Sequence, residues 1–134
     1  MSNPIVLTGE MHSSWVANLE TNINDSSHTD IIGAEFVGPS ISSGLGSDWD
    51  CIYKNALPYN KHVKYYNGRT GGYVLCQVTP QYWQSDYYVA DSLSSGSSPV
   101  SRMASWYVKP APRSAPKQAN HLARERLKRR GPEL

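Results

Sequence analysis

Short runs of apolar and aromatic residues, separated by glycine, serine, asparagine and proline, constrain this chain more than any other feature. Most of these runs have the length of a β-strand and end at turn-forming residues. Nine tyrosines and four tryptophans stand against a single phenylalanine. Tyrosine and tryptophan bury much apolar surface and keep a polar group, which suits a β-sheet whose edges are exposed to solvent. The sequence therefore predicts a β-rich body with strands at 4–8, 31–37, 62–66, 73–79, 81–91 and 100–108.

Three further local predictions belong to this framework. Residues 13–19 have the pattern of a helix start, because two serines that can serve as N-caps precede spaced apolar residues. Residues 51–59 predict a short helix that a proline stops. The strands at 62–66 and 73–79 flank a glycine-rich turn and so predict a β-hairpin.

Length and composition narrow the class of protein. A chain of 134 residues can form one modest domain. Its mean hydropathy is -0.53, and no apolar run approaches the roughly 20 residues of a membrane span. The first residues lack the pattern of a signal peptide, and the localisation stays unknown. Two cysteines are too few for a disulfide framework, so we expect free, buried thiols.

The charges divide the chain into two parts. Seven of the 13 lysines and arginines lie in residues 110–134. We therefore predict a folded body at 1–109 and, at 110–134, a proline-spaced linker with a basic tail that is disordered or a frayed helix. Nucleic-acid binding by this tail is not favoured, because no aromatic residue is interleaved with its basic residues.

A carboxylate and an imidazole follow the first predicted strand at Glu10 and His12. In extended backbone, residues i and i+2 point the same way, so both side chains can face one ion. Gly9 permits a sharp turn before them. Judged on the pair alone, a structural, hydrogen-bonded His12 is the commoner case. Other candidate ligands have no metal-binding spacing: Asp48, Asp50, His62, Glu35 and His28.

Four stretches carry longer motifs in a fixed order. They are VLTGEMHSSW (6–15), EFVGPSISSG (35–44), HVKY with GYV (62–65 and 72–74), and VTPQYW followed by DY (78–83 and 86–87). Together they resemble motifs of the PhoD-type alkaline phosphatases. That family comprises metal-dependent phosphomonoesterases and phosphodiesterases related to the calcineurin-like metallophosphoesterases. The resemblance covers about residues 4–108.

The resemblance implies a fold and a site. The fold is β-rich α+β: the C-terminal portion of a partial metallophosphoesterase-type β-sandwich with few short helices. Glu10 and His12 are implied as metal ligands, with calcium and iron as the family's ions. The family's other ligands lie upstream of this portion. Glu10 stands where the family has aspartate, and its extra methylene moves the carboxylate by about 1.5 Å.

The implied activity is metal-dependent phosphoester hydrolysis. The substrate would be a phosphoester bound once an N-terminal half completes the site, so we expect the chain alone to be inactive and not to retain metal. A non-catalytic binding or interaction module and a degenerate remnant stay open as alternatives. Unpaired strand edges also favour self-association of the isolated chain.

Two polar features near the motifs could contact a substrate, but in each case a structural interpretation is favoured. Ser40, Ser42 and Ser43 could line a substrate mouth, but a solvated loop with local turns is the favoured reading. Arg69 in the predicted turn could contact a phosphate, although such an arginine is more often only solvated.

Overall fold

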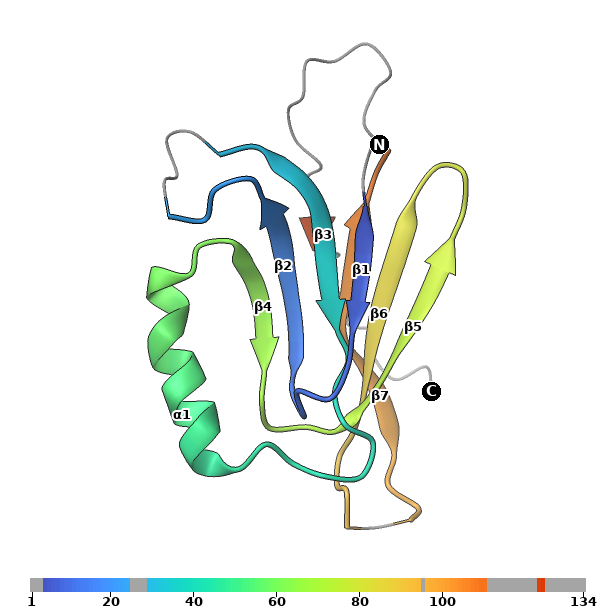
Figure 1. The fold of residues 1–134 in the computed structure, drawn as a ribbon. Coiled ribbons are helices and arrows are strands. Elements are labelled where there is room, and N and C mark those ends of the chain that lie inside the picture. Colours follow the sequence, from blue (N-terminus) through green and yellow to red (C-terminus); the bar gives the residue numbers. More distant parts are fainter. Residues whose placement is uncertain (1–3, 25–28, 95, 111–122, 125–134) are drawn as a thin grey trace.

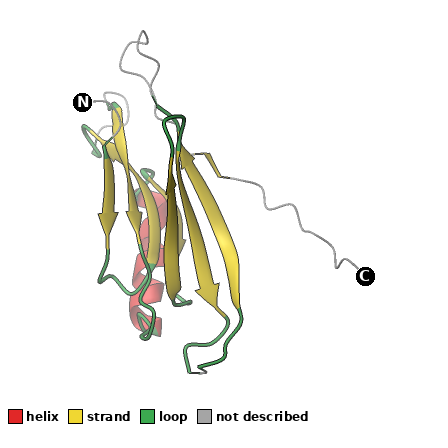
Figure 2. Cartoon of the chain, turned by 90° about the vertical axis from the view of Figure 1, so that its right-hand side faces the viewer, coloured by secondary structure: helices red, strands yellow, loops and turns green. Residues whose placement is uncertain are grey.

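The computed structural model describes residues 4–24, 29–94, 96–110 and 123–124. Within these residues, two four-stranded sheets face each other, and a helix lies beside the first sheet (Figure 1). Seen from the side, the sheets form the two layers of a sandwich (Figure 2). In chain order the elements are β1 (Ile5–Thr8), β2 (Ser14–Glu20), β3 (Ile31–Val37), α1 (Ser47–Ala56), the 3₁₀ helix η1 (Leu57–Tyr59), β4 (Val63–Asn67), β5 (Gly72–Val78), β6 (Trp83–Ala90), β7 (Val100–Val108) and β8 (Ala123–Arg124).

The first sheet has the strand order β1-β3-β2-β4. β1 runs parallel to β3, whereas β2 runs antiparallel to both β3 and β4. Val16 on β2 pairs with Phe36 on one side and with Tyr65 on the other. Because alternate residues of a strand share a face, this register places one row of large side chains on the inner face of the sheet.

The second sheet has the order β5-β6-β7-β8, and all of its pairs are antiparallel. The two sheets meet in one buried cluster formed by Val16, Ala34, Phe36, Tyr87, Ala104, Trp106 and Val108. The hydroxyl of Tyr87 crosses this core and donates a hydrogen bond to the carbonyl oxygen of Trp15, at 2.6 Å. The sandwich is thus held by apolar burial and by a direct polar link between its layers.

The expected fold class is confirmed: the chain is strand-rich with few short helices, and it forms a partial β-sandwich. The strands expected at 4–8, 31–37, 62–66, 73–79, 81–91 and 100–108 appear as β1, β3, β4, β5, β6 and β7. These six predictions succeeded because each run has strand length and is bounded by turn residues.

The helix predicted at 13–19 is wrong, because these residues form β2. Ser14, Val16 and Asn18 are buried on one face of the strand, and Ala17 on the other face is buried as well. β2 lies between β3 and β4, and its backbone forms strand pairs with both. Tertiary packing therefore overrides the local helix pattern, and neither serine caps a helix.

The predicted hairpin is also wrong. β4 belongs to the first sheet, where it pairs with β2, and β5 belongs to the second sheet, where it pairs with β6. The glycine-rich turn between them carries the chain from one layer to the other. A Cβ at Gly72 would lie 2.0 Å from the carbonyl oxygen of Tyr88, so the crossing demands glycine there.

The helix predicted at 51–59 is confirmed in part. α1 begins earlier, at Ser47, and the proline lies in η1, which follows α1 directly. Cys51 and Cys76 are free thiols, as expected. Cys51 is exposed, however, and Cys76 is half-buried, so the expectation of buried thiols is wrong at Cys51 and only partly met at Cys76.

The predicted tail falls mostly outside the described residues. Its described part is β8, which pairs with Trp106 and Tyr107 of β7. The boundary between body and tail at 109/110 and the nature of the rest of the tail stay predictions. In the part of the chain that the structure describes, no helix is long and apolar enough to cross a membrane.

Replacing Tyr87 by phenylalanine tests the link between the layers. Tyr87→Phe removes the donor and leaves the Trp15 carbonyl unpaired on that side, so we expect the free energy of unfolding to fall by about 1–2 kcal/mol. Urea denaturation at neutral pH measures this change. Tyr73→Phe is the matched control, because Tyr73 lies exposed on β5. An equal effect of both substitutions would contradict a special role for Tyr87.

The same tyrosine predicts an alkaline limit to stability. Burial raises the pKa of Tyr87 above its ordinary value of 10.0, and neighbouring Tyr65 adds to the rise. The folded state therefore keeps the hydroxyl protonated, and this contribution is full below about pH 10 and is lost as the pH rises further. We expect Tyr87→Phe to lose less stability than the wild type above that pH, as measured by urea midpoints along a pH series.

Candidate functional site

The candidate ligands Glu10 and His12 lie in the link between β1 and β2, just beyond the carboxyl end of β1. Both residues have positive φ angles, 65° at Glu10 and 51° at His12. The expectation of an extended backbone at Glu10 and His12 is therefore wrong, because both residues adopt the left-handed conformation. Gly9 is not among the glycines with positive φ, so the sharp turning falls on the two ligand candidates themselves.

Buried polar contacts hold this link in place. Ser13 is fully buried, and its hydroxyl donates to the carbonyl of Met11 at 3.0 Å. The same oxygen accepts a hydrogen bond from Nε1 of Trp15 at 2.8 Å. Ser13 thus fixes the turn that carries His12 rather than capping a helix. Sequence reasoning saw the Ser-Ser-Trp motif but missed this role.

The loop at 40–43, which follows β3, contacts His12 and is called the serine loop below. The Ser43 hydroxyl lies 3.2 Å from Nδ1 of His12 and 2.8 Å from the hydroxyl of Ser40. Ser40 also accepts hydrogen bonds from the backbone N–H groups of Ser42 and Ser43. The favoured reading of local turns is confirmed, and the loop additionally orients the imidazole.

The remaining candidate ligands do not join Glu10 and His12. Among the described residues, no group of three or more His, Cys, Asp and Glu side chains could hold a metal ion. Glu35 accepts a hydrogen bond from Thr8, and His62 lines a groove on the same sheet. Asp48 lies in the first turn of α1, and His28 lies outside the described residues.

Asp50 instead forms an ion-pair cluster. The residue is 6% exposed, and its carboxylate accepts hydrogen bonds from Lys54 Nζ at 2.6 Å, Arg69 Nε at 3.1 Å and the Tyr66 hydroxyl at 3.0 Å. The Lys54 hydrogen bond, aided by those of Arg69 and Tyr66, lowers the pKa of Asp50. Burial raises the pKa of Tyr66, and its hydrogen bond to Asp50 adds to this rise.

The cluster places Arg69 at the same end of the first sheet as Glu10 and His12. β4 ends at Asn67 opposite Ser14, where β2 begins, and Arg69 follows directly. The side chain of Arg69 is 77% exposed, yet its Nε donates a hydrogen bond to the carboxylate of Asp50. It is therefore an anchored cation rather than a merely solvated one.

The two sheets form a partial β-sandwich, and Glu10 and His12 lie at one end of its first sheet. The family model described as "PhoD-like phosphatase" matches residues 1–87. This chain therefore belongs to the PhoD-like phosphatase family.

A curated protein and a solved structure are similar to this chain. Alkaline phosphatase D of Bacillus subtilis (strain 168) is 39% identical over 107 residues, which are 79% of this chain and 18% of that protein. The solved structure titled "Structure of PhoD" matches with a TM-score of 0.71 and 35% identity, covering 90% of this chain and 22% of that one. The chain thus spans about a fifth of the length of these relatives.

The Asp50 cluster predicts an acid-dependent loss of stability. Because the pKa of Asp50 lies below its ordinary value of 3.8, the charged carboxylate stabilises the fold above about pH 4, and this contribution is lost as the pH falls below that value. We expect wild type to be more stable than Asp50→Asn at neutral pH and the two to converge in acid. Urea midpoints along a pH series measure the difference. Asp48→Asn on the same helix is the control, and a constant difference at every pH would contradict the prediction.

Proposed function

We propose that this chain forms the part of a PhoD-like phosphatase that contributes Glu10 and His12 to a metal centre for phosphoester hydrolysis. The observation that carries the proposal is the left-handed backbone at both residues. A non-glycine residue in this region costs about 1–3 kcal/mol, and such strain gathers at functional sites. Here the turn is retained because Ser13 and Trp15 hold it.

The chemistry of the donor set fits part of a metal centre. A carboxylate suits calcium, and carboxylate with imidazole suits iron. Ser43 engages Nδ1 of His12, so Nε2 is the ring nitrogen left for a metal. A hydrogen bond at one imidazole nitrogen commonly fixes the ring for coordination by the other. Centres of this kind need about four to six ligands, so further ligands must come from outside the described residues.

Metal ions in such centres stabilise charge on the phosphoryl oxygens and activate water. This chain's own contribution is to position the two proposed metal ligands and to attract the anionic substrate. The turn holds Glu10 and His12 at the sheet end, and the serine loop sets the plane of the imidazole. Arg69, anchored by Asp50 at the same sheet end, supplies a cation that can attract an anionic phosphoester.

A chimera tests this function. Residues of this chain replace the 107 matching residues of Bacillus subtilis alkaline phosphatase D, and hydrolysis of p-nitrophenyl phosphate esters is measured with calcium and iron present. We expect the chimera to be active and His12→Ala to lower its activity at least about 100-fold. Loss of a residue that supports a metal ligand typically costs about 10–100-fold, and loss of the ligand itself should cost more. Glu10→Gln should behave similarly, whereas Glu10→Asp should retain activity.

Asp30→Asn is the matched control for Glu10→Gln, because Asp30 is an exposed carboxylate before β3, at the opposite end of the sheet. It should leave kcat/KM within about twofold. A folded chimera that hydrolyses nothing, or one in which His12→Ala and Asp30→Asn behave alike, would overturn the proposal. The chain would then be better described as a non-catalytic module.

A further inference from the structure

A polar cleft of about 620 Å³ opens at the end of the first sheet that carries Glu10 and His12. Its lining comes from the loop at 44–46, from α1 and from the turn at 68–69. Gly44 directly follows Ser43, the residue whose hydroxyl contacts the His12 imidazole. The cleft therefore adjoins the candidate metal centre on the side of α1.

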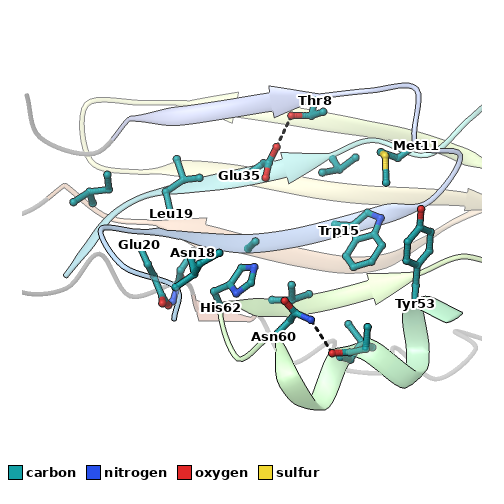
Figure 3. A pocket seen from close by; sticks show the side chains of 17 residues that line it. Thr8, Met11, Trp15, Asn18, Leu19, Glu20, Glu35, Tyr53, Asn60 and His62 are labelled. Atoms are coloured by element: carbon teal, nitrogen blue, oxygen red, sulfur yellow. Dashed lines mark hydrogen bonds between the residues drawn. The ribbon is translucent and has the colours of Figure 1, made fainter. Parts of the chain in front are cut away.

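α1 presents one face to this cleft and another to the groove shown in Figure 3. Tyr53 points into that groove, where its ring meets the Trp15 ring edge to face at 5.2 Å. Asp50, Cys51 and Lys54 line the cleft instead. The cleft is thus a separate cavity, and its charged side chains suit a charged ligand.

The charges of the cleft favour an anion. Among the described residues that line it, three are charged: Asp50, Lys54 and Arg69. Lys54 Nζ and Arg69 Nε bind the same carboxylate oxygen of Asp50, Oδ2, so the two cations lie side by side. The other oxygen, Oδ1, accepts the hydrogen bond from Tyr66. Two cations against one carboxylate leave the lining with a net charge of +1.

Both cations keep hydrogen-bond donors that Asp50 does not use. A guanidinium and an ammonium each have more N–H donors than the single one that Asp50 accepts from them. Within the part of the chain that the structure describes, neither Lys54 nor Arg69 has a further side-chain partner. A phosphate group matches these donors, because its oxygens can accept several charge-assisted hydrogen bonds at once.

The two sides of the cleft differ in how tightly they are packed. A Cβ at Gly44 or at Gly46 would meet no heavy atom within 4 Å, so the loop side is open. A Cβ at Gly68 would lie only 2.7 Å from Oδ1 of Asp50, so the turn packs closely against this carboxylate. The close packing holds the backbone before Arg69, and the open side leaves room for a ligand.

We propose that the cleft binds a second phosphate group of the substrate, and that Asp50 is a positioning residue that holds Arg69 and Lys54 for it. The substrate is then an organic phosphoester that carries another phosphate beyond the one that is hydrolysed. Glu10 and His12 belong to the centre that acts on the first phosphate, and the two cations bind the second. The inference rests on the proposed function for the hydrolysed phosphate, but binding in the cleft requires no catalysis.

Phosphate binding is measured first on the full 134-residue chain. Inorganic phosphate is added at constant ionic strength, and the amide signals of Ser47 and Gly68, which line the cleft, are followed by two-dimensional NMR. We expect saturable shifts, with a dissociation constant at least about 10-fold lower than that of acetate, because phosphate has more charge and more acceptor oxygens. No saturable shift, or equal affinity for acetate, would overturn the proposal.

Gly44→Leu blocks the cleft with little effect on the fold. Gly44 is not among the residues with positive φ, and a side chain there enters open space. We expect the dissociation constant for phosphate to rise at least about 10-fold, because the new side chain occupies the site. Gly96→Leu is the matched control, since Gly96 also has open space around it and lies outside the cleft. Equal effects of the two substitutions would contradict binding in the cleft.

Asp50→Asn separates positioning from charge. The substitution makes the cleft more positive, so attraction alone predicts tighter phosphate binding. It also weakens the hold on Arg69 and Lys54, and we therefore expect phosphate binding to become at least about threefold weaker. Arg69→Gln should cost less in the Asp50→Asn background than in the wild type, because the two residues act together. Tighter binding by Asp50→Asn, or additive losses, would overturn the positioning role.

The chimera described above tests whether the cleft serves the substrate. Propane-1,3-diol bisphosphate and propyl phosphate are compared by the inorganic phosphate that each releases. We expect kcat/KM to be at least about 10-fold higher for the bisphosphate, and Gly44→Leu to reduce this ratio at least about fivefold where Gly96→Leu preserves it.

Equal kcat/KM values per phosphate ester, or a ratio that Gly44→Leu leaves unchanged, would show that the cleft does not select the substrate and would overturn the proposal. An inactive chimera would count against the proposed function alone. In that case the phosphate titrations of the full chain and its Gly44→Leu variant still decide whether the cleft is a phosphate site.

Discussion

The hydrogen bond from the Tyr87 hydroxyl to the Trp15 carbonyl is the interaction on which the rest of the structure depends. Tyr87 is fully buried in the second sheet, and Trp15 lies near the start of β2 in the first. The bond therefore fixes how the layers are aligned at the point where β2 begins. The turn with Glu10 and His12 leads directly into that point, so the core of the sandwich positions the candidate site.

At the end of the first sheet that carries Glu10 and His12, an unfavourable backbone conformation is held by neighbouring contacts. Left-handed backbone at Glu10 and His12 is unfavourable by itself, and Ser13, Trp15 and Ser43 supply the contacts that retain it. Support of this kind fixes the two side chains in place, which is what the proposed role of Glu10 and His12 as metal ligands requires. The Asp50 cluster extends the same principle to Arg69, because a buried carboxylate anchors a long side chain that would otherwise be mobile.

Much of the strand framework could be predicted from the sequence, because runs such as 31–37 and 100–108 are buried and have clear boundaries. The predictions that failed depended on long-range pairing. The local pattern at 13–19 is ambiguous between helix and strand, and only insertion between β3 and β4 decides it. Likewise, β4 and β5 look like a hairpin until their different partners are known. Glu10 and His12 are candidates because of their residue types, but their backbone geometry depends on buried contacts that no spacing reveals.

The pairing of β2 with β4, which lie far apart in the chain, has a consequence for how the chain folds. Ser14 pairs with Asn67, so β2 remains an unpaired edge on that side until a segment much later in the chain arrives. Contacts this distant in sequence close large loops, which slows folding compared with a meander of neighbouring strands. During synthesis the first layer cannot close before β4 has left the ribosome, and the apolar residues of β2 are exposed to chaperones for that interval.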